Sequence, residues 1–308
     1  MDFKQIESFI AVAETGSFTK AAKIMNVSQP SISLHVQNLE SELKTSLLLR
    51  DTKKIKMTER GQEFYECAKS MLRLKDRMLR DWADEDKGLI RIGASSIPSS
   101  YILPEVLSTY QRLHPNIHVN IFQADSEKVV AGLHGGDYQI ALVGMNVQDD
   151  DVNCMPFYYD RFVLITPATV TYKNLYETYK LTRQQDILVK ILRERPVIFR
   201  EEGSGSQKTT GRILRELHLL EDELNISARL NDTESIKKMV QGGLGVAILS
   251  GKAVENEATD GSVYAFELFF PEAERTLNVV SFKKDKLKKH EEDFIAFLKQ
   301  YYEYTYKR

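Results

Sequence analysis

The stretch from Ser28 to Leu43 reads SQPSISLHVQNLESEL, and its two faces differ in chemistry. Aliphatic residues recur on one face at steps of four, three and four, the spacing of a buried helical stripe: Ile32, Val36, Leu39 and Leu43. The other face carries hydroxyl and amide side chains where surface helices usually carry Lys and Glu. Because hydroxyls and amides both donate and accept hydrogen bonds, this face is suited to reading the edges of DNA bases.

Capping signals place two further helices before this stretch. An apolar period over 3–13 predicts a first helix that ends at a glycine, and Ser17 can cap a second helix. Ser28 can cap the third helix, with Pro30 tolerated in its first turn. The next segment, LLLRDTKKIKMT, alternates around a polar turn and predicts a two-stranded wing. Residues 1–58 therefore indicate a winged helix-turn-helix domain.

The second helix of a helix-turn-helix motif presents exposed side chains near its start to the major groove. We expect amides to bond base edges, hydroxyls to bond bases or phosphates, and one leucine to touch a thymine methyl. These side chains are Gln29, Gln37 and Asn38, then Ser31 and Ser33, then Leu34, with His35 at the flank for a phosphate. Salt-dependent phosphate anchoring is expected from Lys20, Lys23, Arg50, Lys53, Lys54 and Lys56. The alternative is a solvated three-helix domain that contacts proteins.

A long polar helix is predicted over 59–87. Its apolar residues follow steps close to a heptad seam: Phe64, Ala68, Met71, Met78 and Trp82, interrupted by Lys75. Such a helix extends about 40 Å, too far for a small domain to bury its stripe alone. We expect a second copy of the chain to cover it and form a homodimer. The alternative is packing on the C-terminal region of the same chain.

After Gly88, strands alternate with helices, which predicts a mostly parallel sheet with ligands at the carboxyl ends of its strands. The expected strands are 89–95, 116–122, 138–144, 161–167, 195–199, 245–250 and 276–282, with helices over 99–113, 126–134, 205–217 and 233–241. This length exceeds one sheet of this kind, so we expect two lobes. Lobe I would comprise 88–161 and 268–308, and lobe II 162–267. The whole chain is predicted to be an α+β multidomain protein.

The segments ESFIAVAETGSFTKAA, VSQPSISLHVQNLE and LLLRDTKKIKMTERGQ resemble the DNA-binding region of LysR-type transcriptional regulators, and the similarity covers essentially the whole chain. The resemblance implies a two-lobed effector domain like periplasmic binding proteins and base contacts from Gln29, Pro30, Ser33 and residue 34, next to Ser28. It also implies homotetramers that bend an operator, activation of neighbouring genes with repression of its own, and RNA polymerase as a candidate partner. Leu34 departs from the basic residue common in the family, so we expect a different operator preference.

Two hydroxyl-rich helix starts indicate an anion site in the C-terminal region. Ser204, in EEGSGS, precedes one predicted helix, and a second serine cluster precedes another: Ser95, Ser96, Ser99 and Ser100. Free N–H groups at a helix start bind anions. The family resemblance implies that these loops line an effector cleft through Ser95, Ser96, Ser204 and Ser206, together with Ser99, Gly205 and, at the rim, Gly144. The alternative is that each serine simply caps a helix, which is worth about 1 kcal/mol.

Composition narrows the remaining classes. The chain has 308 residues, 42% of them hydrophobic, and a net charge of −2, so no whole-chain charge demands nucleic acid or a membrane. Two distant cysteines favour a reducing compartment, although a thiol switch through Cys154 stays open. No apolar run suits a membrane helix, so a cytoplasmic protein without a membrane partner is expected. No cofactor is expected.

Enzyme and metal motifs fail on inspection. Gly243-Leu-Gly245 lies between a helix and a strand, the reverse of a dinucleotide fingerprint, and Pro115 separates His114 from His118. Nucleophile-elbow and Walker motifs are also missing. We therefore expect a ligand-responsive DNA-binding regulator that senses a small carboxylate or a sulfur or selenium oxyanion, since EEGSGS resembles regulators of sulfur-type metabolism and carbon fixation. The alternatives are a solute-binding module and an enzyme that uses the cleft.

Overall fold

The computed structural model describes residues 1–50, 55–83, 88–202, 204–283 and 287–303. The chain divides into two compact units, which are described separately: unit 1 comprises Met1–Asp86 with Gly135–Asp137, and unit 2 comprises Lys87–His134 with Tyr138–Arg308. The predicted phosphate contacts of Lys53, Lys54 and the Arg50 side chain lie outside the described residues and stay predictions.

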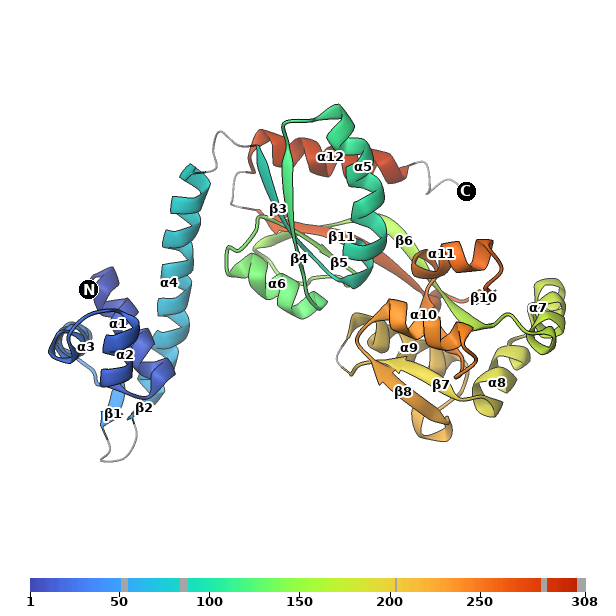
Figure 1. Cartoon of the computed structure of the whole chain (residues 1–308), viewed down its shortest axis with the longest axis horizontal. Helices are drawn as coiled ribbons and strands as arrows, with labels where there is room; N and C mark the ends of the chain where they lie inside the picture. Colours follow the sequence, from blue (N-terminus) through green and yellow to red (C-terminus); the bar gives the residue numbers. More distant parts are fainter. Residues whose placement is uncertain (51–54, 84–87, 203, 284–286, 304–308) are drawn as a thin grey trace. The chain divides into compact units, whose positions relative to one another are not determined.

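Unit 1 is a three-helix domain with a wing and a long helix (Figure 1). Its elements are α1 (Phe3–Thr15), α2 (Phe18–Ile24), α3 (Gln29–Leu43), β1 (Leu48–Arg50), β2 (Ile55–Met57) and α4 (Glu59–Ala83). Asp2 and Gln5 form a capping box at the start of α1, and Gly16 ends that helix with a left-handed φ of 62°. Ser17 and Ser28 accept hydrogen bonds from Lys20 N and Ser31 N, so both predicted serine caps are present.

The predicted stripe of α3 forms the centre of the domain core, with one exception. Ile32, Val36 and Leu39 are fully buried against α1 and α2, whereas Leu43 is 36% exposed. The prediction of burial was wrong for Leu43 because it is the last helical residue: the backbone turns left-handed at Lys44 (φ 51°) and leaves the region that α1 and α2 cover. Three stripe residues are thus enough to orient α3.

Hydrogen bonds between side chains and backbone groups fix the wing to α3 and α4. Glu40 Oε1 accepts hydrogen bonds from the N–H groups of Leu47 (2.7 Å) and Leu48 (3.1 Å), which joins α3 to β1. Thr58 Oγ1 donates to Ser46 O (2.8 Å) and accepts from Gly61 N (2.8 Å). A Cβ atom on Gly61 would lie 2.0 Å from the carbonyl oxygen of Leu47, so only glycine permits this approach of α4 to the wing.

The two halves of α4 differ in their surroundings. Phe64 packs edge-on against Phe9 of α1 at 5.3 Å, and Lys75 Nζ pairs with Glu7 Oε1 at 2.6 Å. Ala68, between them, is fully buried. The later apolar residues are 43–66% exposed: Leu74, Met78, Leu79 and Trp82. α1 therefore covers the first half of the predicted seam and leaves the second half open, while the second copy of the chain stays a prediction.

Unit 2 contains a mixed sheet. β3 (Leu89–Ala94) runs parallel to β4 (His118–Gln123) and β5 (Ile140–Val143), whereas β6 (Val152–Pro167) is antiparallel to β11 (Glu274–Phe282), β9 (Ala247–Ser250) and β10 (Val263–Glu267). β7 (Val197–Arg200) pairs in parallel with β8 (Ile226–Leu230). The prediction of a mostly parallel sheet was therefore wrong, because β6 and β11 return antiparallel through the middle. β8, β10 and the first part of β6 were not predicted.

Separate hydrophobic clusters mark two parts of unit 2, which we call lobe I and lobe II. In lobe I, α5 (Leu103–Leu113) and α12 (Lys289–Glu303) cover one face of the sheet around Ile92, and α6 (Ser126–His134) covers the other. In lobe II the helices are α7 (Val170–Thr182), α8 (Gln185–Glu194), α9 (Gly205–Glu216), α10 (Thr233–Gln241) and α11 (Gly251–Thr259). Three short helical turns complete the unit: η1 (Pro98–Ile102), η2 (Glu221–Glu223) and η3 (Pro271–Ala273).

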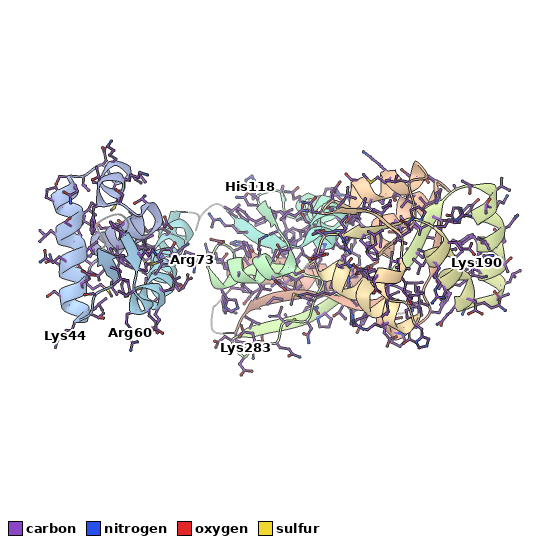
Figure 2. The ribbon with its side chains drawn as sticks, turned by 90° about the horizontal axis from the view of Figure 1, so that it is seen from below. Lys44, Arg60, Arg73, His118, Lys190 and Lys283 are labelled. Carbon is purple, nitrogen blue, oxygen red and sulfur yellow. The ribbon has the colours of Figure 1, made fainter. Side chains whose placement is uncertain are left out.

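β6 runs from lobe I into lobe II (Figure 1). Lys283 and Lys190 lie toward opposite ends of the unit, in lobe I and lobe II respectively (Figure 2). The lobe limits of 88–161 with 268–308 and of 162–267 stay predictions.

The contact between Gly61 and Leu47 predicts a sharp effect of one methyl group. Gly61→Ala should lower the free energy of unfolding by about 1–3 kcal/mol, because the added carbon overlaps a backbone carbonyl. Urea unfolding followed by circular dichroism measures the change. Gly211→Ala is the matched control, because Gly211 lies inside α9 with nothing within 4 Å, and alanine there should be neutral or stabilising. An unchanged urea midpoint in Gly61→Ala would show that the wing tolerates a shift of α4.

Candidate nucleic-acid interface and ligand cavity

The polar face of α3 lies at the surface of unit 1. Leu34 is 56% exposed, although it is aliphatic. Among the other predicted base-reading and flanking residues, the exposed ones are Ser28, Gln29, Pro30, Gln37 and Asn38. The half-buried ones are Ser31, Ser33 and His35. The sequence therefore places this set on one accessible face, as amphipathicity requires.

Short-range hydrogen bonds hold the start of this face in place. Ser28 Oγ lies 2.8 Å from Ser31 Oγ, and Gln29 Nε2 donates to Ser33 Oγ at 2.8 Å. These bonds leave the side-chain amide oxygen (Oε1) of Gln29 free to accept a hydrogen bond from a partner. They also leave the hydroxyl hydrogen of Ser33 free to donate one. The first turn of α3 thus presents an acceptor and a donor in fixed positions.

His35 has a structural contact that sequence reasoning missed. Its Nδ1 atom lies 2.8 Å from the hydroxyl of Ser8, which is fully buried in α1. This bond ties α3 to α1 through the interior of the domain. His35 therefore helps to position the polar face, and only its remaining ring edge is available for the predicted phosphate contact.

Exposed basic side chains surround the polar face on other elements of unit 1. Lys20 and Lys23 are exposed on α2, and Lys56 is exposed on β2. Lys44 at the end of α3 and Arg60 in the first turn of α4 also project outward (Figure 2). Arg60 pairs with Glu63 at 2.8 Å, so its charge is partly balanced. Lys44 was not predicted, and its place directly after the recognition stripe was the available signal.

A cavity of about 790 Å³ lies between the lobes of unit 2. Both predicted serine clusters reach it: Ser95, Ser96, Ser204, Gly205 and Ser206 all line the cavity. Ser99 does not line the cavity. Its hydroxyl donates to Gln123 Oε1 (3.2 Å), and Gln123 does line the cavity. Gly144 lines a neighbouring cavity of about 580 Å³ instead. The structure therefore brings together five of the seven predicted residues.

Two helix N-termini meet at the cavity. Ser204 caps α9 by accepting a hydrogen bond from Gln207 N at 3.1 Å, and Asp125 caps α6 through Lys128 N at 2.8 Å. A Cβ atom on Gly205 would lie 3.8 Å from Ser126 Oγ, so the first turns of the two helices face each other closely. Their positive dipole ends favour an anion between them. Sequence reasoning missed Ser126, although Asp125-Ser126 directly after a strand was a capping signal.

Two carboxylates that line the cavity, Glu201 and Asp125, are paired with cations. Arg200, 5% exposed, binds Glu201 with two hydrogen bonds of 2.8 and 2.9 Å and also donates to Thr233 Oγ1 at 3.1 Å. The Lys128 ammonium hydrogen-bonds to Asp125 and holds the pKa of that carboxyl below its usual value. These pairs reduce the repulsion that an anion would meet from the cavity wall.

Arg275 lies at the boundary between the two cavities and lines both. It stands directly opposite Asp160 in the ladder of β11 and β6, and its Nε atom donates to Asp160 Oδ2 at 2.9 Å. Asp160, which is 2% exposed, also accepts a hydrogen bond from Ser250 Oγ at 2.8 Å. The Arg275 guanidinium packs over the Phe162 ring at 4.7 Å. Sequence reasoning missed Arg275, which lies directly before the predicted strand 276–282 and carried no evident signal.

Polar contacts connect the lobes on both sides of the cavity. Lys208 Nζ of α9 pairs with Glu127 Oε1 of α6 at 2.6 Å. Tyr101 of η1 donates to Glu234 Oε1 of α10 at 2.5 Å. Burial raises the pKa of the Tyr101 hydroxyl far above its usual range, and the bond to Glu234 raises it further, so the hydroxyl stays a donor. The lobes are thus joined by polar contacts as well as by the strand β6.

Two properties of the described residues bear on membrane and metal partners. Among the described helices, none combines the length and the apolar character needed to cross a bilayer. Within the same part of the chain, His, Cys, Asp and Glu side chains do not gather in a group of three or more that could hold a metal ion.

Comparisons with known proteins cover both units. Residues 3–62 match the family described as bacterial regulatory helix-turn-helix protein, lysR family, and residues 83–303 match the LysR substrate binding domain. A probable RuBisCO transcriptional regulator of Trieres chinensis is 31% identical over 82% of both chains. The HTH-type transcriptional regulator CysL of Bacillus subtilis (strain 168) is 26% identical over 98% of both.

Solved structures share the fold at low identity. Full-length CbnR complexed with its target DNA superposes with a TM-score of 0.67 at 21% identity, covering 97% of this chain and 99% of that one. Full-length BenM superposes with a TM-score of 0.58 at 19% identity, covering 99% and 98%.

The Asp160–Arg275 pair predicts a strong stability effect. Asp160→Ala should lower the free energy of unfolding by about 3–5 kcal/mol, because it leaves a buried guanidinium without its counter-charge. Adding Arg275→Met should restore part of the loss, since the unpaired charge is then removed. A double-mutant cycle by urea unfolding measures the coupling. Equal and additive losses would show that the two side chains do not stabilise each other.

Proposed function

The chain belongs to the LysR family of bacterial regulatory helix-turn-helix proteins, and from that premise we propose that α3 reads an operator while the cavity of unit 2 binds a small anionic effector. It is a DNA-binding transcription regulator with an effector-binding domain, and not an enzyme. The finer assignments below concern which residues contact DNA, what ligand the cavity takes, and how the two are coupled.

One observation carries the DNA-reading proposal: α3 buries a narrow aliphatic stripe and exposes amides and hydroxyls on the opposite side. Gln29 and Ser33 begin this face and are fixed to each other, so their orientation is set before DNA arrives. Leu34 contributes an apolar contact that suits a thymine methyl. Basic side chains of α2 and the wing anchor the phosphates and make binding salt-dependent.

LysR regulators form oligomers, and we propose that this chain forms a homodimer through α4. The exposed apolar residues in the second half of α4 supply a contact surface that unit 1 does not cover: Leu74, Met78, Leu79 and Trp82. A dimer would present two copies of α3 to successive major grooves of a pseudo-palindromic operator. A homotetramer built from two such dimers and a contact with RNA polymerase remain part of the proposal.

The effector proposal rests on the two helix N-termini that meet at the cavity. Ser204, Gly205 and Ser206 at the start of α9 lie opposite Ser126 at the start of α6, with Ser95 and Ser96 beside them. Backbone N–H groups and hydroxyls are donors suited to a carboxylate or another oxyanion. Ligand in the cavity changes transcription only if it binds two arrangements of the lobes with different affinity. The pairs Lys208–Glu127 and Tyr101–Glu234 are contacts that such a change would break or remake.

The DNA-reading proposal predicts two classes of variant. Gln29→Ala with Ser33→Ala should weaken operator binding by about 1–3 kcal/mol per lost base contact and leave binding to random DNA nearly unchanged. Lys53→Ala with Lys54→Ala should weaken both and flatten the salt dependence. Fluorescence anisotropy with operator and scrambled duplexes at several salt concentrations separates the classes. Equal losses from both double variants on both duplexes would mean that another element reads the groove.

The effector proposal predicts a serine-dependent response to anions. Small carboxylates and oxyanions should raise the melting temperature of the full chain, and Ser204→Ala should abolish the rise. Ser17→Ala is the control, because it removes a comparable helix cap, worth about 1 kcal/mol, in unit 1. A thermal shift that persists in Ser204→Ala would place the anion elsewhere.

A further inference from the structure

The cavity of about 580 Å³ is a second chamber of the same cleft. It shares Ser126, Glu127, Gly205 and Arg275 with the serine-lined cavity, which we call the first chamber. Its remaining wall comes from the side of α9 and from the segments after β5 and at the start of β11: Gly144, Met145, Asn146, Lys208, Thr209, Gly211, Arg212, Arg215, Glu274 and Thr276. A ligand longer than one small anion can therefore reach from the first chamber into the second.

The two chambers differ in charge. The first chamber is lined by the cations Lys128, Arg200 and Arg275 and by four carboxylates, Asp125, Glu127, Glu201 and Glu202. The second is lined by four cations, Lys208, Arg212, Arg215 and Arg275, and by only two carboxylates, Glu127 and Glu274. The positive charge of the cleft is therefore concentrated in the second chamber, away from the serines.

Two of these cations keep their charge available. Glu127 pairs with Lys208 at 2.6 Å, and Glu274 pairs with Arg161, so both carboxylates of the second chamber are already balanced. Within the part of the chain that the structure describes, Arg212 donates only to the neutral hydroxyl of Thr209 at 3.1 Å. Arg212 and Arg215 lie three residues apart on one face of α9 and are both exposed to the chamber.

Arg275 supplies an independent sign of a ligand at the boundary. Its side chain is 7% exposed, and Nη2 is buried without a hydrogen-bond acceptor among the described residues, although it lies 2.8 Å from Asp160 Oδ2 at an unsuitable angle. A Cβ atom on Gly144 would lie 3.1 Å from Nη1, so a larger residue at position 144 would press on the guanidinium. Since Arg275 lines both chambers, its guanidinium supplies positive charge at the boundary where a ligand that reaches from one chamber to the other would pass.

We propose that the effector is a small organic compound with two anionic groups, one in each chamber. The first group lies between the N-termini of α6 and α9 with the serines, and the second is held by Arg212 and Arg215, with Arg275 between them. Two phosphates or two carboxylates on a short polar chain have this chemistry. The inference rests on the proposed effector role of the first chamber and adds the second anionic group.

Compounds with one anionic group (here monoanions) and with two anionic groups (here dianions), whatever charge each group carries, test the second group directly. The full chain is titrated by calorimetry at constant ionic strength with fructose 6-phosphate against fructose 1,6-bisphosphate, and with butyrate against succinate. At least one dianion should bind about tenfold or more tightly than its monoanion, the effect of one added charge-assisted hydrogen bond. Which pair shows the preference distinguishes phosphate from carboxylate.

Variants then locate the preference. Arg212→Gln with Arg215→Gln should remove the tenfold preference and leave monoanion affinity nearly unchanged, because both arginines lie outside the first chamber. Lys190→Gln with Arg193→Gln on α8 is the charge-matched control in the same lobe and should retain the preference. Ser204→Ala should weaken both members of the pair.

The outcomes separate the two proposals. Monoanion binding that depends on Ser204, without any preference for the dianion, would overturn the inference that the ligand has a second anionic group. It would leave the proposal of an anionic effector unchanged. A dianion preference that survives Arg212→Gln with Arg215→Gln would also overturn this inference. Absence of binding by all four compounds, or binding independent of Ser204, would overturn the effector proposal and this inference with it.

Discussion

An α-helix begins with backbone N–H groups that have no partner inside the helix, and both surfaces proposed to carry the function of this regulator are built at such ends. Ser28 caps α3 and Ser204 caps α9, each by accepting one of these N–H groups. The remaining donors and the positive dipole end favour oxygen-rich partners. What differs is the setting: the start of α3 is exposed on unit 1, whereas the start of α9 lies in a cavity opposite α6.

Charge in the cleft of unit 2 is tolerated because most of it is paired. Arg200 binds Glu201 through two hydrogen bonds, and Arg275 shares Asp160 with Ser250. Buried ions are costly unless their partners are close and well oriented, so these pairs have little freedom to move. In the proposal above, the charges of Arg212 and Arg215, which these pairs do not balance, set which anions the cleft prefers.

β6 runs beside the cleft and pairs with strands of both lobes. Its residues 152–161 pair with β11, and residues 162–167 pair with β9 and β10 in lobe II. Asp160 lies just before this change of partners and holds Arg275, which lines both chambers. In the proposed function, a ligand on Arg275 would lie next to the point where one continuous strand passes between the lobes, and this is where we expect binding to affect their arrangement.

The sequence by itself determined the local elements: the three caps and the apolar period define the helices of unit 1, and the serines before predicted helices 99–113 and 205–217 mark the first chamber. It could not show the first part of β6, where Pro156 and a bulge opposite Leu277 interrupt the alternation. Nor could it show the second chamber, the Ser8–His35 bond or the Asp160–Arg275 pair. Periodicity and capping act over a few residues, whereas these contacts join residues far apart in the chain, and only the tertiary structure decides which of them meet.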